Sequence, residues 1–424
     1  MHTRNIFTLW IVLSWSGHGW TQDLSEPSTS DFATSYPDIE LVEFVVSAVD
    51  KNPRVLATQA ALNASDALRS AASRPLYNPE IEVEATNAEV ETRTLGISQT
   101  FDIGNKRAAL DAVATADMEA AQADLLSARQ NVTLELLLAV SAFHTASDRD
   151  ALADERVAAL HEFSELAKQR FDAGDLSQTE FNLASLVAAQ ARLGKAVTAS
   201  DLADAVQQLN SLISEVNLTR VPRFDFSLPT IATLEDPLAR LMSLPEIRAA
   251  RLRVDSANAA IDLRQRERRP DPTISLVGGE EGDQRLVGLS LSIPLPVRNT
   301  RAAEVTAASE LHLQAWQEAD NILLQSRARF FSAYERYQLA HSAWNDWQQF
   351  GQLSLQNQAD QLEQLWQAGE LSTSDFLVQM SQVIDSEDSA LALRQTLWNA
   401  WFEWLAASNQ IDQWIAFDRD PNQI

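Results

Sequence analysis

Carboxylates and histidines are the side chains that could bind a metal ion here, since the chain has no cysteine. Beyond the N-terminal segment none of the histidines has the spacing of a ligand set: His144, His161, His312 and His341. Paired acids are frequent, but in a chain with 59 aspartates and glutamates they indicate solvated helix faces more often than catalytic pairs. Phosphate-binding, dinucleotide-binding and nucleophile motifs are missing. The sequence therefore predicts no enzyme, no cofactor and no dedicated metal site, and an exported hydrolase using acid pairs would lack any motif to position them.

Two acids stand out because they hold equivalent places in a motif that occurs twice. The motif reads FDAGDLSQTEF at 171–181 and WQAGELSTSDF at 366–376. In each copy an acid follows a serine by three residues, which is the spacing of a capping box at the start of a helix. A negative charge in the first turn also offsets the helix dipole. Glu180 and Asp375 are therefore predicted to cap two helices.

The residues before each acid predict the end of another helix, so each copy forms the tip of a helical hairpin. Glycine supplies the left-handed backbone conformation that terminates a helix, and the serine begins the next one. Long helix-forming stretches flank both copies. The predicted tip residues are Gly174, Asp175, Leu176 and Ser177 in the first copy, and Gly369, Glu370, Leu371 and Ser372 in the second.

The repeated tip belongs to a duplication of the whole chain. Residues 78–107 align with residues 271–299, and the Arg-Pro pair at 74–75 aligns with the pair at 269–270. The period is far too long for a solenoid repeat, which indicates one gene half used twice. The predicted segments are a signal peptide at 1–22, an extended leader at 23–37, a first structural repeat at 38–216, a linker at 217–237, a second structural repeat at 238–415 and a polar tail at 416–424.

Composition and charge narrow the class of protein. The chain has only 12 glycines and 14 prolines in 424 residues and is rich in helix formers. Its net charge of −26 disfavours nucleic-acid binding, because phosphates repel an acidic surface, and it suits either a solvated surface or a channel for cations or for solutes generally. Arg4 followed by the apolar run at 6–15 indicates a cleaved signal peptide rather than a membrane anchor, since that run is too short to span a bilayer. We expect an exported protein that would cross a membrane only with strands.

Two pairs of short segments show the alternation of β-strands. At 80–87 and 92–101, and again at 273–276 and 287–295, apolar residues alternate with small or polar ones. This alternation is typical of transmembrane barrels, although a half-buried hairpin packed on a helix shows it too. Four strands are too few to close a barrel, and lipid does not tolerate open strand edges. Membrane-spanning strands would therefore require an oligomer, and three copies would give twelve strands.

Long helical patterns connect the strands to the tips. The stretch at 106–171 would be roughly 100 Å long at 1.5 Å per residue, and the chain returns at 180–214. The second half repeats this order at 305–366 and 374–415. Its aromatic face is predicted to serve packing rather than ligand binding, and consists of Phe330, Tyr334, Tyr337, Trp344 and Trp347. Helices of this length predict a coiled coil or a helical tube.

Together the signal peptide, the duplicated units and the Gly-acid-Leu-Ser tips resemble the TolC family of outer-membrane efflux ducts. The segments NPEIEVE, LGISQTFDIGNKR, RPDP and LSIPLPVRN are similar, more narrowly, to the outer-membrane subunits of cobalt–zinc–cadmium resistance pumps. The resemblance covers nearly all of the chain after the signal peptide. It implies a mainly α fold with a transmembrane β part: a trimeric α/β barrel with four strands per chain in a twelve-stranded barrel, and a long antiparallel helical tunnel.

The resemblance also implies partners and a location. A homotrimer would contact outer-membrane lipid of a Gram-negative bacterium and extend into the periplasm. There its eight tip residues would meet a periplasmic adaptor (membrane fusion) protein bound to an inner-membrane RND-type pump. Glu180 and Asp375 would form an acidic periplasmic gate, although Val378 stands where the archetype has a second aspartate.

The resemblance makes divalent heavy-metal cations the expected solute. A duct for drugs or other organic compounds, or for type I secretion, is an alternative within the same class. A periplasmic coiled-coil scaffold, whose hairpins merely cap the helices, is the alternative from another class. Apolar faces on all four strands favour the duct, because a scaffold does not need them.

Overall fold

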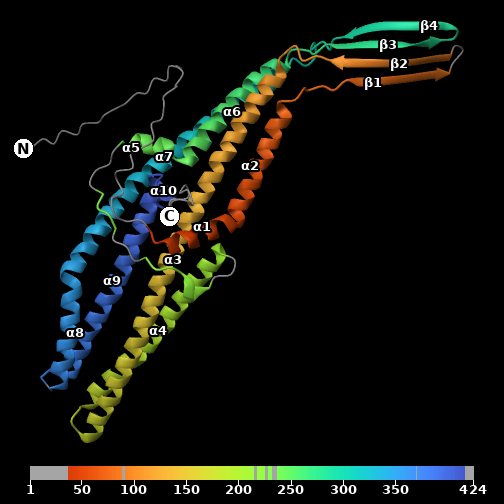
Figure 1. The fold of residues 1–424 in the computed structure, drawn as a ribbon. Coiled ribbons are helices and arrows are strands. Elements are labelled where there is room, and N and C mark those ends of the chain that lie inside the picture. Colours follow the sequence, from red (N-terminus) through yellow and green to blue (C-terminus); the bar gives the residue numbers. More distant parts are fainter. Residues whose placement is uncertain are drawn as a thin grey trace, which may run out of the picture.

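The computed structural model describes residues 37–87, 91–213, 217–224, 228–231, 236–368 and 370–415. The predicted signal peptide, nearly all of the leader and the polar tail lie outside these residues, as do parts of the linker and Gly369. Figure 1 shows long helices with a sheet at one end and two helical hairpin ends at the other.

The four strands form one antiparallel sheet in chain order. They are β1 (Glu80–Asn87), β2 (Glu91–Thr100), β3 (Thr273–Glu281) and β4 (Gln284–Ser292). The β2–β3 pairing joins the hairpin of the first half to that of the second. All four predicted strands are confirmed, but the last was expected to reach residue 295. It ends at Ser292 because Pro294 and Pro296 have no N–H to donate to a neighbouring strand.

The sheet has one apolar and one polar face. Directly paired residues share a face, and one row across the four strands joins Ile81, Ile97, Leu276 and Leu289. Each of these side chains is more than half exposed. The next row, on the other face, joins Glu80, Ser98, Ser275 and Ser290. The apolar face is therefore left uncovered by the described part of this chain.

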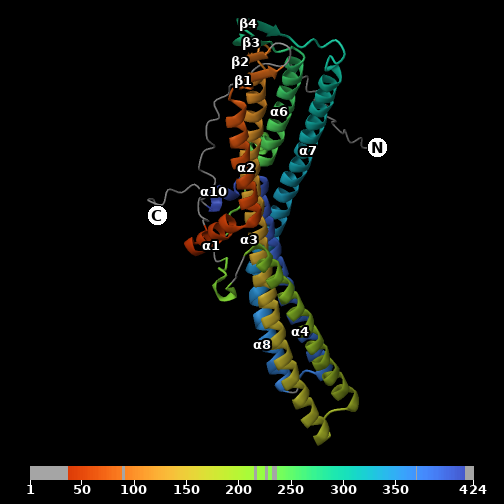
Figure 2. The same cartoon turned by 90° about the vertical axis from the view of Figure 1, so that its right-hand side faces the viewer.

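Four helices lie next to the sheet. They are α2 (Pro53–Ala72), α3 (Lys106–Ala173), α6 (Pro245–Glu267) and α7 (Ala302–Asp346). They pack side by side in the order α2, α3, α6, α7 (Figure 2). Pro53 and Pro245 each open a helix, where a missing N–H costs nothing. The Asn52 side chain caps the first of these helices by accepting the N–H of Arg54 at 2.9 Å.

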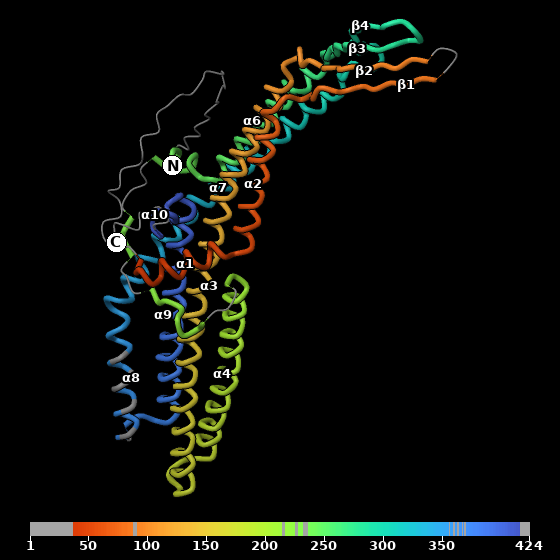
Figure 3. Tube along the Cα trace, turned by 45° about the vertical axis from the view of Figure 1, so that its right-hand side comes forward, coloured from red at the N-terminus to blue at the C-terminus, as the bar shows by residue number. Residues whose placement is uncertain are grey.

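Toward the hairpin ends the order of the helices changes. Here α4 (Gln178–Leu212) packs on α3, α3 on α9 (Thr373–Ala407), and α9 on α8 (Gln352–Gln367). Figure 3 shows α4 and α8 at the two outer edges of this part. Within the described residues no helix is long and apolar enough to cross a membrane.

Two predicted helices are interrupted. A π-helix at Trp347–Gly351 divides the helix expected at 305–366, and the N–H of Gln352 bonds the carbonyl of Trp347 across it. Gly351 permits this turn, because a Cβ there would lie 2.3 Å from the Trp347 ring. The helix expected to reach residue 415 ends at Ala407, where Asn409 adopts a φ of 59° before α10 (Ile411–Ile415) begins.

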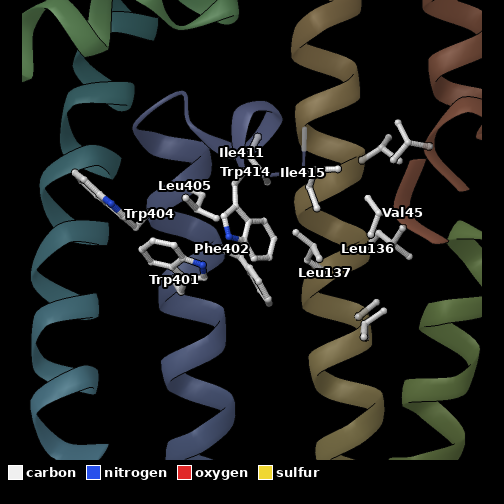
Figure 4. Close-up of a cluster of buried hydrophobic side chains, with 14 of the residues drawn as sticks. Val45, Leu136, Leu137, Trp401, Phe402, Trp404, Leu405, Ile411, Trp414 and Ile415 are labelled. Atoms are coloured by element: carbon white, nitrogen blue, oxygen red, sulfur yellow. The ribbon is translucent and has the colours of Figure 1, made fainter. Parts of the chain in front are cut away.

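A core at mid-length joins α1 (Ile39–Lys51) and α10 to the long helices. Figure 4 shows Trp401, Phe402 and Leu405 of α9 beside Trp414 of α10 and Leu137 of α3. The aromatic face predicted for packing contributes here, since Phe330 and Tyr337 of α7 are buried and lie against Trp404 and Trp401.

The linker between the two halves crosses the long helices at the same level. Arg223 pairs with Asp148 of α3 at 3.0 Å, and the Phe224 ring lies 5.0 Å from that of Trp398 on α9. Farther along the linker, the Gln338 side chain of α7 donates to the carbonyl of Ile231 at 2.5 Å. The linker thus ties α3, α9 and α7 together.

Candidate functional site

The first hairpin end (residues 171–181) terminates α3 as the sequence predicts. Gly174 has a φ of 84°, in the left-handed region that favours glycine. Its N–H bonds the Phe171 carbonyl at 2.9 Å, and the Asp175 N–H bonds the Arg170 carbonyl at 2.8 Å. These two bonds are the Schellman pattern that satisfies the last carbonyls of a helix. The end is therefore a defined turn.

Ser177 and Glu180 form a complete capping box at the start of α4. The Glu180 N–H donates to Ser177 Oγ at 3.2 Å, and the Ser177 N–H donates to Glu180 Oε2 at 2.9 Å. Ser177 Oγ also donates to the same carboxylate at 2.6 Å. The hydrogen bond from the serine hydroxyl, and then the one from its backbone, lower the pKa of Glu180. The carboxylate is thus held in its charged form.

The second hairpin end (residues 366–376) repeats the turn with a shorter acid. The Glu370 N–H bonds the Leu365 carbonyl at 2.9 Å, equivalent to the Asp175–Arg170 bond of the first end. Ser372 Oγ accepts the Asp375 N–H at 3.1 Å and donates to Asp375 Oδ2 at 2.7 Å. Asp375 thus caps α9 through the serine hydroxyl, while Glu180, one methylene longer, also reaches the serine backbone.

The described tip residues lie at the surface. The exposed ones are Gly174, Asp175, Ser177, Glu370, Ser372 and Asp375, and the half-buried ones are Leu176, Leu371 and Glu180. Gly369 lies outside the described residues. Val378, one turn after Asp375, is 68% exposed. The two ends therefore expose polar groups and partly expose two leucines, and the capping role predicted for both acids is confirmed.

An aromatic pair packs across each hairpin end, at equivalent positions of the two copies of the motif. Phe171 and Phe181 stack 5.2 Å apart at the first end, and Trp366 and Phe376 stack 5.1 Å apart at the second. These residues open and close the two copies of the motif, so their spacing in sequence already pairs them. The second pair is buried, whereas the first is half-exposed.

Sequence reasoning missed the contacts that join the two hairpins. Phe163 of α3 lies 4.7 Å from the Trp366 ring and 5.3 Å from the Phe376 ring. The Arg170 guanidinium lies 4.9 Å above the Trp366 ring, within cation–π distance. Nothing local marks Phe163 and Arg170, because their partners lie about half the chain away.

Ion pairs extend the link between the hairpins along α3 and α9. Asp148 bonds Arg394, and Arg149 Nε lies 2.8 Å from Asp388 Oδ1. In the described part of the chain, no group of three or more histidines and acids is placed to hold a metal ion.

Comparisons with known proteins agree with this geometry. Residues 45–215 match the family described as outer membrane efflux protein. The chain is similar to the nickel-cobalt-cadmium resistance protein NccC of Alcaligenes xylosoxydans xylosoxydans, with 28% identity over 287 residues. That alignment spans 62% of this chain and 62% of NccC, so it covers less than two thirds of that relative.

Two further comparisons extend the likeness. The nickel and cobalt resistance protein CnrC of Cupriavidus metallidurans is 25% identical over 65% of this chain and 69% of its own length. The outer-membrane channel OprN shares the fold, with a TM-score of 0.75 and 17% identity over 88% of this chain and 90% of OprN. At this identity the likeness to OprN is one of fold. Residues 45–215 are thus similar to the outer membrane efflux protein family, and the whole described fold is similar to that of solved outer-membrane channels.

Proposed function

We propose that this chain is the outer-membrane duct of a tripartite efflux system and passively conducts divalent heavy-metal cations. In this proposal it acts as a homotrimer together with a periplasmic adaptor and an inner-membrane RND-type pump. The observation that carries the proposal is that, within the described residues, the sheet and the two sets of packed helices each have two open edges. The duct itself supplies no energy and performs no reaction.

The sheet, the helices next to it and the helices near the tips each have one edge from the first half of the chain and one from the second. The sheet ends in β1 on one side and β4 on the other, and the helices next to it end in α2 and α7. Toward the tips the edge helices are α4 and α8. A second copy placed beside the first would therefore meet β4, α7 and α8 with its own β1, α2 and α4. Such head-to-tail contacts form a closed ring when the rotation between neighbouring copies is a whole fraction of a turn, which is one third of a turn for three copies.

The edge helices carry the apolar side chains that such contacts need. On α4, Leu186, Leu193 and Val197 are at least half exposed and follow one face. At the opposite edge, Phe350 and Leu353 are 64% and 65% exposed. Exposed apolar surface of this kind marks an interface. Three copies would join their sheets into twelve strands, with the apolar face toward lipid and the polar face toward water.

The hairpin ends supply the contact with the adaptor in this proposal. Gly174, Asp175, Leu176 and Ser177 would meet it, together with Gly369, Glu370, Leu371 and Ser372. An adaptor that binds an open arrangement of these ends more tightly than a closed one shifts the equilibrium toward the open duct. Glu180 and Asp375 would place negative charge at the entrance while they cap their helices.

The names of NccC and CnrC support metal cations as the solute. The test is growth of a strain that lacks this protein, with and without its gene restored, across graded nickel, cobalt, zinc, cadmium and copper and a panel of dyes and detergents. We expect the strain that lacks the protein to be sensitive to the metals and not to dyes or detergents, and the restored gene to return growth on metals to normal. Sensitivity to dyes and detergents instead would support a duct but would contradict metal cations as its solute. No sensitivity to either group, with the adaptor and pump intact, would overturn the duct.

The oligomer has a separate test. The protein should leave the membrane with detergent and not with salt, and native mass spectrometry should give three copies. A soluble monomer would favour the coiled-coil scaffold.

A further inference from the structure

A groove of about 620 Å³ runs along α9 between residues 378 and 393, and Trp347 also lines it. Its polar lining residues are Ser381, Gln382, Asp385, Ser386 and Ser389, while apolar atoms, including those of Trp347, Val378 and Leu393, form the larger part of its surface. The groove begins one turn above Asp375 of the second hairpin end. In the proposed duct the groove therefore starts near the entrance and follows either the inner or the outer wall.

The groove occupies one face of α9 that stays the same over several turns. Asp375, Val378, Gln382, Asp385 and Ser389 follow one another in steps of three and four residues. With 3.6 residues per turn, such steps keep side chains on one face. Asp385 thus lies on the same face as Asp375, about 15 Å farther along the helix at 1.5 Å per residue.

The opposite face of α9 is covered by other parts of the chain. Trp398 lies nine residues after Ser389, which is two and a half turns, and it packs on Phe224 of the linker. Phe402 packs on Trp414 of α10 on that side, and α1 and α10 lie to one side of the long helices (Figures 2 and 4). In the proposed ring of three copies, α1, α10 and the linker would block the central passage if they lay on its inner side. The covered side of α9 is therefore the outer side. The groove therefore faces inward.

The groove presents oxygen atoms to water. Ser386 Oγ donates to the Gln382 carbonyl at 2.8 Å, and Ser389 Oγ donates to the Asp385 carbonyl at 2.7 Å. Both hydroxyl hydrogens are used within the helix, so the oxygen lone pairs remain free to accept. Oxygen acceptors suit hydrated cations.

Asp385 and its neighbour Asp388 differ in how far their charge is neutralised. Asp388 makes a 2.8 Å ion pair with Arg149 Nε and accepts a hydrogen bond from Nη2 of the same guanidinium at 2.9 Å. Asp385 is 3.9 Å from Arg156, beyond hydrogen-bond distance, and its side chain is 70% exposed. The charge of Asp385 thus acts mainly on the groove.

We propose that this face of α9 lines the conducting passage and that Asp385 is a residue there that selects cations over anions. The proposal rests on the proposed function, because it requires the ring. Three copies of Asp385 would form a negative ring above that of Asp375, in a wall of hydroxyl and amide oxygens.

The first test measures ion selectivity in planar bilayers under a KCl gradient. Asp385→Asn should lower the cation-to-anion permeability ratio about two- to fourfold at 0.1 M salt, where the Debye length is about 10 Å and a ring of three charges is only partly screened. Asp388→Asn, which removes the same charge from the side facing α3, should change the ratio less. Equal effects of the two variants, or none, would overturn the role of Asp385.

The second test uses the absence of cysteine, which makes single-cysteine labelling clean. A charged methanethiosulfonate reagent on Ser389→Cys should change single-channel current, whereas labelling of Arg223→Cys, on the linker side, should not. Complete labelling at Ser389→Cys with unchanged current would show that this face lies outside the passage. If the parent protein forms no pores at all, the proposed function fails rather than this inference.

Discussion

The ring of Phe163, on the first hairpin, lies 4.7 Å from the ring of Trp366, on the second. This contact joins two copies of one motif that are equivalent in sequence but differ in surroundings. The Trp366–Phe376 pair of the second end is buried against Phe163 of α3, while the Phe171–Phe181 pair of the first end is half-exposed. The two hairpin ends are thus stabilised by different contacts, although their sequences are equivalent.

Phe163→Ala should loosen the second hairpin end. Removing a buried aromatic ring costs about 3 kcal/mol or more, since the cavity refills only in part. We expect faster hydrogen exchange at residues 370–380, measured by mass spectrometry on the detergent-solubilised protein. Phe171→Ala is the matched control: its ring is half-exposed, so its effect should stay at the first end. Equal loosening of both ends by Phe163→Ala would contradict this account.

Gly174→Ala should destabilise the first end by about 1 kcal/mol, because an L side chain is strained at positive φ. Space is not the cause, since nothing lies within 4 Å of a Cβ at this position. Gly194→Ala, inside α4 and equally open, should instead stabilise the helix by about 0.5–1 kcal/mol. Thermal unfolding followed by circular dichroism measures both, and shifts in the same direction would argue against the turn assigned here.

Gly279→Ala should destabilise the sheet, whereas its neighbour Gly278→Ala should not. A Cβ on Gly279 would lie 2.0 Å from the Arg93 carbonyl oxygen on the adjacent strand, so β2 and β3 would have to separate. Nothing lies within 4 Å of a Cβ on Gly278. Overpacking of this kind costs about 1–3 kcal/mol. The measurement is the heat resistance of the oligomer on a denaturing gel, and a larger loss for Gly278→Ala would contradict the strand register.

Asp148 should make stability depend on acid pH. Its burial raises the pKa of the carboxyl, but hydrogen bonds from Arg223 and Arg394 outweigh burial and leave the pKa below its usual value. A depressed pKa stabilises the fold above the unfolded value of about 3.9, and this contribution is lost as pH falls through the lower folded value. The Tm difference between the parent and Asp148→Asn should be constant from pH 7 to 5 and shrink below pH 4. A difference that is as large at pH 3 as at pH 7 would rule out the ion pairs as its source.

The sequence predicted much of the secondary structure because its signals are local. Glycine at 174 and the serine–acid spacing after it determine a turn within a few residues, whatever surrounds them. Prolines at 53 and 245 begin helices, and alternating side chains set the faces of the strands. Prolines at 294 and 296 could also have marked the early end of β4, but the apolar pattern continued past them.

Tertiary structure alone decided how these parts meet. The contact of Phe163 and Arg170 with Trp366, and the path of the linker over α3, α9 and α7, depend on how long helices pack along their whole length. The π-helix at Trp347–Gly351 arises where the Trp347 ring folds over Gly351. Asp385 and Asp388 are alike in sequence, and only the position of α3 leaves one charge open to the groove and pairs the other. Local signals fix turns and strand faces, whereas contacts between residues far apart in the chain depend on the rotation of each helix about its axis, which packing sets.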